Sequence, residues 1–267
     1  MRVNDYNQFM TSRIRSQRVE AIVLRHADWG EADRLLWLFT RELGKVKVIA
    51  KGVRKPRSRK AGHLEPFTRT ELVLAQGRDF PIVTQAEAID AYLEIHADLV
   101  RVAYASYVIE LIDRFTYEEG ENFALFRLLS DTLKRINQEA ESTFAVRYYE
   151  IRLLDLVGFR PQLFQCVNCG SEIQPEDQYF SFEKGGVICP QCAPKVNEAH
   201  SISMPALKIL RHFQRSNYND AKRARLSQAV DHELENLMGN YLTYVLERGL
   251  NTPSFLHHVR KNTITPE

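Results

Sequence analysis

The spacing of hydrophobic positions changes near residue 90, and the two patterns predict two kinds of structure. Before that point, short apolar or alternating stretches are separated by turn residues, with no helical period between them. These stretches are residues 19–25, 35–40, 45–50, 67–75 and 81–88. Such stretches are typical of β-strands. Five strands in about seventy residues favour a small closed barrel, and an OB-type Greek-key barrel is one such fold.

From about residue 96 onward, apolar residues recur every three or four positions, which predicts amphipathic helices. One such series is Phe126, Leu129, Leu133 and Ile136. Gly158, with Pro161 shortly after it, predicts the end of a helix, because glycine readily adopts the left-handed conformation found there. A stretch with four cysteines then interrupts the helices, which resume at Ser203.

These patterns predict an α+β multidomain protein. An N-terminal five-stranded OB-fold β-barrel is followed by an all-α helical domain with an inserted four-cysteine zinc module. The expected boundaries are 1–18 for an N-terminal extension, 19–92 for the barrel, 93–160 and 201–250 for the helical domain, 161–200 for the zinc-binding insert and 251–267 for a C-terminal tail.

No stretch approaches eighteen consecutive apolar residues, which argues against a membrane span, and the N-terminus lacks the apolar core of a secretory signal. We therefore expect a cytoplasmic protein. Disulfides are rare in that compartment, so its cysteines need another explanation.

The four cysteines form two C-x-x-C pairs, Cys166 with Cys169 and Cys189 with Cys192, separated by nineteen residues. This spacing is typical of a tetrahedral Zn²⁺ site with four thiolate ligands. The alternative is a set of four buried free thiols. Four cysteine ligands fill the coordination shell and leave no position for a reactive water, so the predicted zinc is structural and not catalytic.

A basic loop lies between the third and fourth predicted strands. Six of its ten residues are cationic: Lys51, Arg54, Lys55, Arg57, Arg59 and Lys60. So many like charges favour a solvated loop that attracts a polyanion, because binding to phosphates releases condensed counterions. Residues 1–80 carry 17 Lys/Arg and 9 Asp/Glu, a balance of +8, whereas the remainder carries 19 and 25, a balance of −6. The alternatives are a merely solvated charged face or a nuclear-localisation signal.

Three aromatic residues near the predicted barrel, Trp29, Trp37 and Phe80, could stack on unpaired bases. Trp37 lies in mid-strand between leucines, so core packing is the favoured interpretation for it. Phe80, in a turn, is the better stacking candidate.

Catalytic apparatus is hard to find in this sequence. Asp28, Glu31 and Asp33 could hold a divalent metal in a nuclease, but turn formation and local ion pairing with Arg34 explain them better. No phosphate-binding glycine loop, dinucleotide fingerprint or nucleophile elbow is present. We therefore expect a protein that is not an enzyme.

Several fragments in series resemble the RecO family of bacterial recombination mediators. They are A-I-V-L-R at 21–25, G-E-A-D-R at 30–34, L-F-T at 38–40, E-L-G-K-V at 42–46, A-K-G-V-R-K at 50–55, L-E-P-F at 64–67 and R-Y-Y-E-I-R-L-L-D-L-V-G-F-R-P at 147–161. The resemblance covers about residues 19–250. The polar extension before it departs from the family pattern.

The resemblance implies a non-enzymatic recombination mediator in DNA repair. Such a protein binds single- and double-stranded DNA, anneals complementary strands and, with RecR, helps to load RecA onto DNA coated by the single-stranded-DNA-binding protein SSB. It would be cytoplasmic and nucleoid-associated. Candidate DNA-binding residues are Arg34, Lys47, Lys51, Arg54, Lys55, Arg57, Arg59 and Lys60. The alternative is an RNA-binding or transcription-associated OB-fold and zinc-ribbon protein, with a metal-dependent nuclease as a remote third.

Binding of the acidic SSB tail, as the resemblance implies, would require an apolar groove with a nearby cation in the helical domain. Candidates on the predicted helices are Arg127, Arg135, Arg147 and Arg152.

Overall fold

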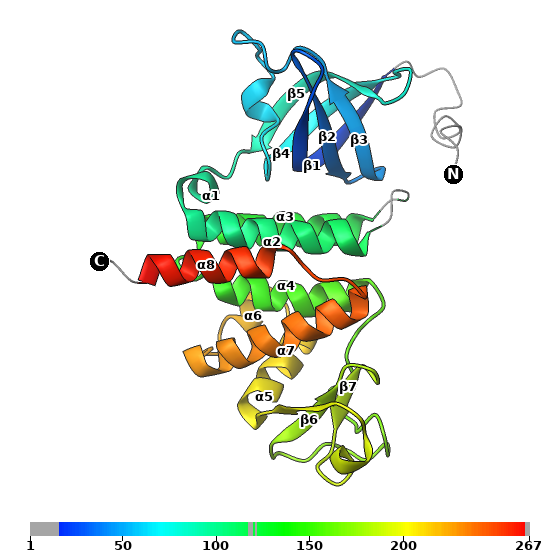
Figure 1. Ribbon diagram of the computed structural model, residues 1–267, viewed down its shortest axis with the longest axis vertical. Coiled ribbons are helices and arrows are strands. Elements are labelled where there is room, and N and C mark those ends of the chain that lie inside the picture. The colour runs from blue at the N-terminus through cyan, green and yellow to red at the C-terminus, as the bar shows by residue number, and fades with distance from the viewer. Residues whose placement is uncertain (1–15, 117–119, 121, 265–267) are drawn as a thin grey trace. The chain divides into compact units, whose positions relative to one another are not determined.

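The computed structural model describes residues 16–116, 120 and 122–264, so most of the expected N-terminal extension lies outside the described residues. The chain divides into two compact units (Figure 1). One unit, the barrel unit, consists of the chain up to Leu93 together with Thr116–Leu133. The other, the helical unit, consists of Glu94–Phe115 and the chain from Lys134 onward.

Five strands close into a barrel in the order β1-β2-β3-β5-β4. They are β1 (Ser16–Trp29), β2 (Asp33–Thr40), β3 (Gly44–Ala50), β4 (Arg69–Ala75) and β5 (Ile82–Asp90). Neighbouring strands are antiparallel except β3 and β5, which close the barrel through one parallel pair, Ile49 with Ile82. The predicted fold class, a five-stranded barrel before a helical domain, is confirmed.

Small aliphatic side chains fill the barrel, because alternate residues of a strand point to the same face. The buried set includes Val19, Ala21, Val23, Leu36, Leu38, Val48, Ala50, Leu72, Leu74 and Val83. Trp37, between two of these leucines, therefore points outward. It lies across from Arg25 on β1 and Lys47 on β3, and the Arg25 guanidinium carbon sits 3.6 Å from the indole centroid. The expectation that Trp37 packs in the core is wrong.

The first part of α3 (Phe123–Gln138) belongs to the barrel unit and covers part of the outer face of β2. The ring of Phe126 lies 6.2 Å from that of Phe39, which is fully buried although it points away from the barrel interior. Tyr92, after β5, donates a hydrogen bond to the carbonyl of Ser130 on the same helix. This segment therefore completes the hydrophobic packing of the barrel unit.

The helical unit is built around α4 (Ser142–Leu156), whose side chains are buried along most of its length. Three helices pack against it: α2 (Leu99–Phe115), α5 (Met204–Arg215) and α7 (Gln228–Leu246). The short α1 (Leu93–Ala97) precedes α2, and the short α6 (Tyr218–Ala221) contacts α5. Gly158 has a φ of +88°, and the Phe159 N–H donates to the Leu154 carbonyl, so α4 ends where the sequence predicts. No helix among the described residues is long and apolar enough to cross a membrane.

The stretch expected as a C-terminal tail contains a helix, α8 (Thr252–Ile264), which packs against α2. Leu256 and Val259, three residues apart, are each only 3% exposed, so one face of α8 is part of the core. The backbone N–H groups at the start of α8 bind the side chain of Glu110 on α2. Most of the stretch expected as a tail is therefore a helix that packs into the helical unit.

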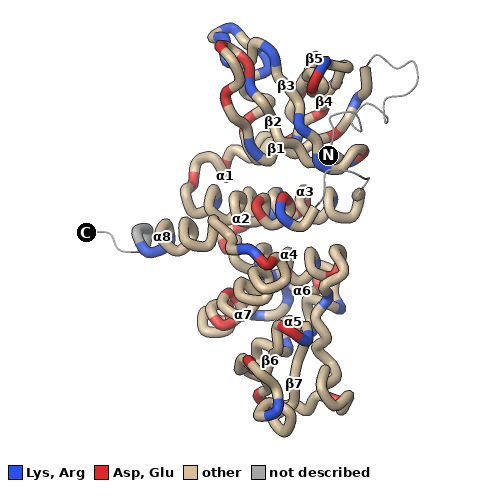
Figure 2. Tube along the Cα trace, turned by 45° about the vertical axis from the view of Figure 1, so that its right-hand side comes forward, with Lys and Arg blue, Asp and Glu red and all other residues tan. Residues whose placement is uncertain are grey.

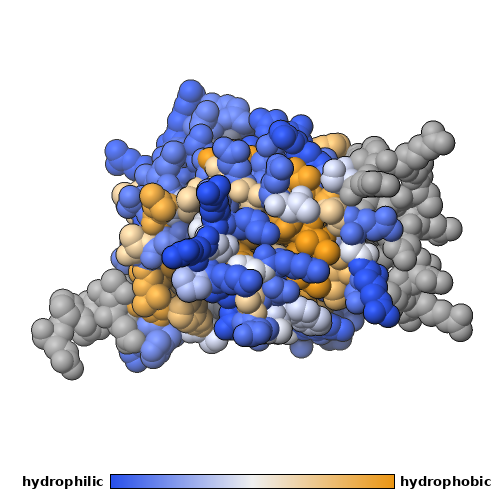
Figure 3. All heavy atoms as spheres, turned by 90° about the horizontal axis from the view of Figure 1, so that it is seen from above, coloured by the Kyte–Doolittle hydropathy of each residue, from blue (hydrophilic) through white to orange (hydrophobic). Residues whose placement is uncertain are grey.

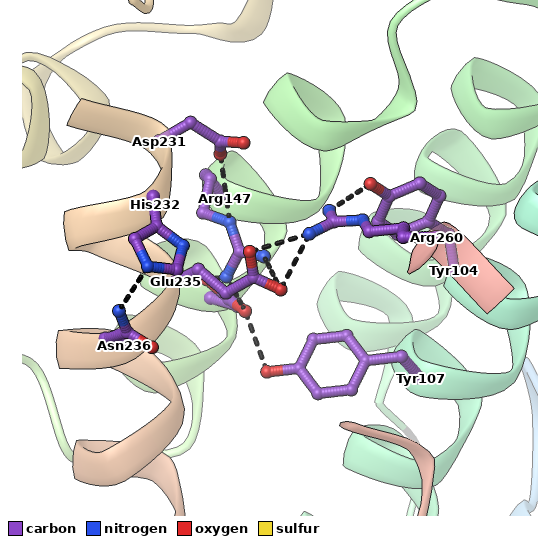
Figure 4. Close-up of polar contacts among 9 residues, drawn as sticks. Tyr104, Tyr107, Arg147, Asp231, His232, Glu235, Asn236 and Arg260 are labelled. Carbon is purple, nitrogen blue, oxygen red and sulfur yellow. Dashed lines mark hydrogen bonds and ion pairs between the residues drawn. The ribbon is translucent and has the colours of Figure 1, made fainter. Parts of the chain in front are cut away.

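A charged cluster is buried between the helices of this unit (Figure 4). Arg147, 2% exposed, donates hydrogen bonds of 2.6 and 2.7 Å to Glu150, which also accepts one from the Tyr107 hydroxyl. Asp231 and Glu235 on α7 also lie near the guanidinium, 3.4 and 3.7 Å from its Nε and its second terminal nitrogen. Burial raises the pKa of Glu150 despite this ion pair. Arg147 is therefore occupied and inaccessible, and its proposed contact with an acidic peptide is excluded.

Candidate nucleic-acid interface and metal centre

The basic loop, residues 51–60, is attached firmly to the barrel at its start. The Gly52 N–H donates a 2.7 Å hydrogen bond to Oδ1 of Asp33, and the Arg54 N–H donates to the Ala32 carbonyl at 3.0 Å. Val53 is 1% exposed and belongs to the barrel core. The loop is therefore an ordered projection next to the β1–β2 turn.

Five of the six predicted cations of this loop are exposed: Lys51, Arg54, Lys55, Arg57 and Arg59. Arg54 lies 3.1 Å from Asp28 and donates to the Glu31 carbonyl, so its charge is partly satisfied. Among the described residues, no acidic side chain pairs with the other four. Figure 2 shows Lys and Arg residues in the loops at the upper end of the barrel. This loop thus presents a concentrated positive charge to the solvent.

Lys60 differs from its neighbours because it is half-buried. Its Nζ donates a 3.0 Å hydrogen bond to the Val83 carbonyl on β5, and burial lowers its pKa. The expectation that all six cations stay solvated is wrong for this residue. Lys60 instead attaches the end of the loop to the barrel.

The two cations that were expected to extend the track are also half-buried. Arg34 pairs with Glu65 at 2.9 Å, and only 20% of its side chain is exposed. Burial acts to raise the pKa of Glu65, but the contacts with Arg34 and His26 outweigh it and lower that pKa. Lys47 lies on the outer barrel face across from Trp37. Arg34 is thus already neutralised by Glu65.

The acidic residues of the β1–β2 turn do not converge on one point. Asp33 accepts the Gly52 N–H, while Asp28 pairs with Arg54. Both serve local structure, as expected, although the partner of Asp28 is Arg54 and not Arg34. In the part of the chain that the structure describes, the only group of three or more residues placed to bind a metal is the cysteine quartet.

The four cysteines come together in a small module formed by β6 (Gln178–Ser181), β7 (Gly186–Ile188) and β8 (Ala199–Ile202). Their sulfurs all lie within 4.8 Å of one another, and Cys169 Sγ is 3.9 Å from Cys189 Sγ. A tetrahedral ion with Zn–S bonds of about 2.3 Å would hold its sulfurs about 3.8 Å apart. Two tight turns bring this about, with the Gly170 N–H donating to the Cys166 carbonyl and the Cys192 N–H to that of Cys189.

The surroundings of these sulfurs shift their pKa values in both directions: burial raises the pKa of Cys189 to about 11, whereas the pKa values of Cys166 and Cys169 are lowered. The Cys189 N–H lies 3.4 Å from Cys166 Sγ and donates to it. Contacts with the side chain and the backbone of Ser171, whose Oγ lies 3.3 Å from Cys169 Sγ, lower the pKa of Cys169 to about 6. His200 is not part of this cluster, because its ring stacks on Phe182 at 4.0 Å. The donor set is therefore four sulfurs, and it could hold a metal ion.

The remaining candidate arginines of the helices do not form a common site. Arg135 stacks on Tyr218, with its guanidinium carbon 3.7 Å from the ring centroid, and Arg152 donates to the Gln214 carbonyl. Arg127, with 86% of its side chain exposed, lies in the barrel unit. Arg25 is a further exposed cation of the barrel that no local sequence pattern indicated, and the cross-strand register places it beside Trp37.

Two family models match almost the whole chain. The model described as the N-terminal part of recombination protein O matches residues 14–92, and the model of its C-terminal part matches residues 96–253. Their border falls near residue 93, where the barrel unit's first segment ends.

Curated relatives named DNA repair protein RecO are similar over most of their length. The protein from Roseiflexus sp. (strain RS-1) is 42% identical over 93% of this chain and 88% of its own. One from Dehalococcoides mccartyi is 37% identical over 86% of this chain and 91% of its own length. The protein from Desulforamulus reducens is 33% identical over 92% of this chain and 96% of its own length. The chain therefore belongs to the RecO family of DNA repair proteins.

Proposed function

We propose that this protein is a non-enzymatic recombination mediator in DNA repair. It binds single- and double-stranded DNA, anneals complementary strands and, together with RecR, helps RecA to load onto SSB-coated single-stranded DNA. The observation that carries the proposal is the ordered basic loop, whose cations Lys51, Lys55, Arg57 and Arg59 are exposed and lack acidic partners among the described residues. Membership of a family whose curated members are named DNA repair proteins supports it.

The loop cations contact phosphates and carry no base preference. Each phosphate that is neutralised releases counterions, so affinity falls steeply as salt rises. Annealing benefits from the same chemistry, because cations between two strands reduce the repulsion of their backbones. Arg54 contributes less than its neighbours, since Asp28 already occupies part of its guanidinium.

A structural Zn²⁺ ion, held by Cys166, Cys169, Cys189 and Cys192, fits the sulfur geometry. The ion would cross-link the two turns. It would supply no reaction chemistry, because four protein ligands fill its coordination shell. The module is small, with strands of three and four residues, so the metal would provide much of its stability.

Contacts with RecR, RecA and the acidic SSB tail are part of the same proposal, as is association with the nucleoid. Of the four arginines considered for the tail, Arg147 is excluded by its burial. Arg127 has the most accessible side chain of the other three.

The test measures fluorescence anisotropy of labelled single- and double-stranded oligonucleotides over a range of salt concentrations. Changing Lys51, Lys55, Arg57 and Arg59 to glutamine should weaken binding to both kinds of DNA. It should also reduce the slope of log K against log salt by about 3. A matched control changes four exposed cations of the helical unit to glutamine: Lys184, Lys195, Lys208 and Arg225. Equal losses for both quadruple variants would contradict the assignment of the loop.

Function is tested by annealing of SSB-coated complementary oligonucleotides with and without RecR. Annealing should be faster in the presence of this protein than in its absence. Labelled strands should not be cleaved in Mg²⁺ or Mn²⁺. Preferential binding to RNA, or capture of polymerase or ribosomal components in place of RecR and SSB, would support the alternative class instead.

A further inference from the structure

Two aromatic side chains, one at a strand end and one in a loop, meet at the end of the barrel that carries the basic loop. Trp29, the last residue of β1, is 45% exposed, and Phe80 lies half-buried between β4 and β5. Their ring centroids are 6.3 Å apart, and the rings are nearly perpendicular at 84°. A single exposed aromatic side chain is ordinary, but apolar side chains that gather on the surface with polar residues around them mark a binding site.

Both rings stand on well-fixed backbone. A Cβ on Gly77 would come within 1.9 Å of the Phe80 carbonyl oxygen, so this turn closes tightly only because residue 77 is glycine. The carbonyl of Pro81, the residue after Phe80, accepts a 2.9 Å hydrogen bond from the Ile49 N–H on β3. On the other side, Trp29 pairs with Asp33 at the start of β2. The rings are thus held in place before any ligand arrives.

The same turn that carries Trp29 holds the basic loop. Arg54 is bound to Asp28 and to the Glu31 carbonyl, immediately before and shortly after Trp29. Arg78, an exposed cation, lies two residues before Phe80. Figure 3 looks down on the barrel and shows hydrophilic residues over most of this face, with hydrophobic ones exposed between them. Aromatic rings beside cations are the combination that binds unpaired nucleotides.

We propose that Trp29 and Phe80 form a stacking site for an unpaired nucleobase, while the basic loop binds phosphates of the same strand. This inference rests on the proposed DNA-binding function and adds a means of distinguishing single strands from duplexes. A perpendicular ring pair leaves at least three of its four ring faces outside the ring–ring contact. Bases within a duplex are already stacked on one another and cannot reach these faces.

Trp37 is the other candidate for stacking, but its geometry is less suitable. The Arg25 guanidinium covers its outer ring face at 3.6 Å, so a base would first have to displace that cation. A purely structural role for Trp29 and Phe80, the joining of two loops, is the competing explanation. It differs in its predictions, because loss of a loop contact would affect single- and double-stranded DNA alike.

The experiment compares binding of fluorescein-labelled oligo(dT) and of a duplex by the full chain and by Trp29→Leu and Phe80→Leu. Stacking predicts a loss of about five-fold or more for oligo(dT) and less than about two-fold for the duplex. Trp29→Tyr and Phe80→Tyr keep a ring and should bind as the unmodified protein does. Phe255→Leu removes an aromatic ring of similar exposure from the helical unit and serves as the control.

Intrinsic fluorescence provides a second readout that does not depend on a disruptive variant. The chain has two tryptophans, so Trp37→Phe leaves Trp29 as the only one. Saturation with oligo(dT) should quench this signal strongly, whereas Trp29→Tyr, which leaves Trp37, should show a much smaller change. Unchanged Trp29 fluorescence at saturation, or equal losses for oligo(dT) and duplex in the leucine variants, would overturn the stacking site. If the unmodified protein bound neither DNA, the proposed function itself would fail.

Discussion

The Glu110 carboxylate on α2 accepts hydrogen bonds from both the N–H and the hydroxyl of Thr252, at 2.8 and 2.6 Å. It also accepts the Asn251 N–H, and so it caps the first turn of α8 from another helix. Replacement by glutamine removes the charge from these hydrogen bonds. We expect Glu110→Gln to lower the free energy of unfolding by about 1–2 kcal/mol, measured by chemical denaturation. Glu94→Gln, a change at an exposed position on α1, should alter it by less than about 0.5 kcal/mol.

The same carboxylate gives a prediction about pH. Burial acts to raise the pKa of Glu110, but the hydrogen bonds from Thr252 and Asn251 outweigh it, so the pKa is lower than in the unfolded chain. The stabilisation is therefore complete above the unfolded value, about 4.5, and is lost as pH falls through the folded value. The difference in free energy of unfolding between the unmodified protein and Glu110→Gln should shrink as the pH falls from about 5 to about 3. A constant difference across this range would contradict the assignment.

The buried cluster around Arg147 should be sensitive to loss of one partner. Arg147→Met leaves Glu150 buried without its cation, so we expect a loss of about 3–5 kcal/mol in the free energy of unfolding. The double variant Arg147→Met, Glu150→Met removes both charges and should recover part of that loss. A double variant less stable than the single one would show that other contacts of Glu150, such as that with Tyr107, dominate.

Metal content tests the cysteine module directly. Elemental analysis should find about one zinc per chain, and a strong chelator should lower the midpoint of thermal unfolding. Cys169→Ser should lose the metal and at least about 2 kcal/mol of stability. Ser201→Ala, an exposed change on β8, should do neither. Full stability after complete removal of the metal would argue against a structural zinc.

Two lysines of the basic loop should differ in their effect on DNA binding. Lys55 is exposed, whereas Lys60 already donates to the Val83 carbonyl. Lys55→Gln should therefore reduce the slope of log K against log salt by about 0.9, and Lys60→Gln by less than half of that. Equal slopes in anisotropy titrations would mean that Lys60 leaves the carbonyl when DNA binds.

The sequence was most informative where the determinants of structure lie close together in the chain. Turn residues predict the strands, and each C-x-x-C pair brings two sulfurs together, so the barrel and the cysteine quartet could both be foreseen. Trp37 was misplaced because a continuous apolar run hides the alternation that puts Leu36 and Leu38 inside the barrel.

Long-range partners explain the other differences. The burial of Arg147 depends on Asp231 and Glu235, which come from a helix far along the chain. Helix α8 was missed because its few apolar residues give a weak pattern and its cap, Glu110, is 141 residues before Asn251. The meeting of Trp29 with Phe80 likewise requires the closure of the barrel, which a local pattern does not reveal.

The way the basic loop is attached makes its shape largely independent of the charge that it carries. Asp33 holds the start of the loop through the Gly52 backbone, and the Val83 carbonyl holds Lys60 at its end. Between these two points, the shape of the loop depends little on the charged ends of Lys55, Arg57 or Arg59. Exchange of these side chains would therefore change the charge that the loop presents to solvent and leave the backbone of the barrel unit as it is.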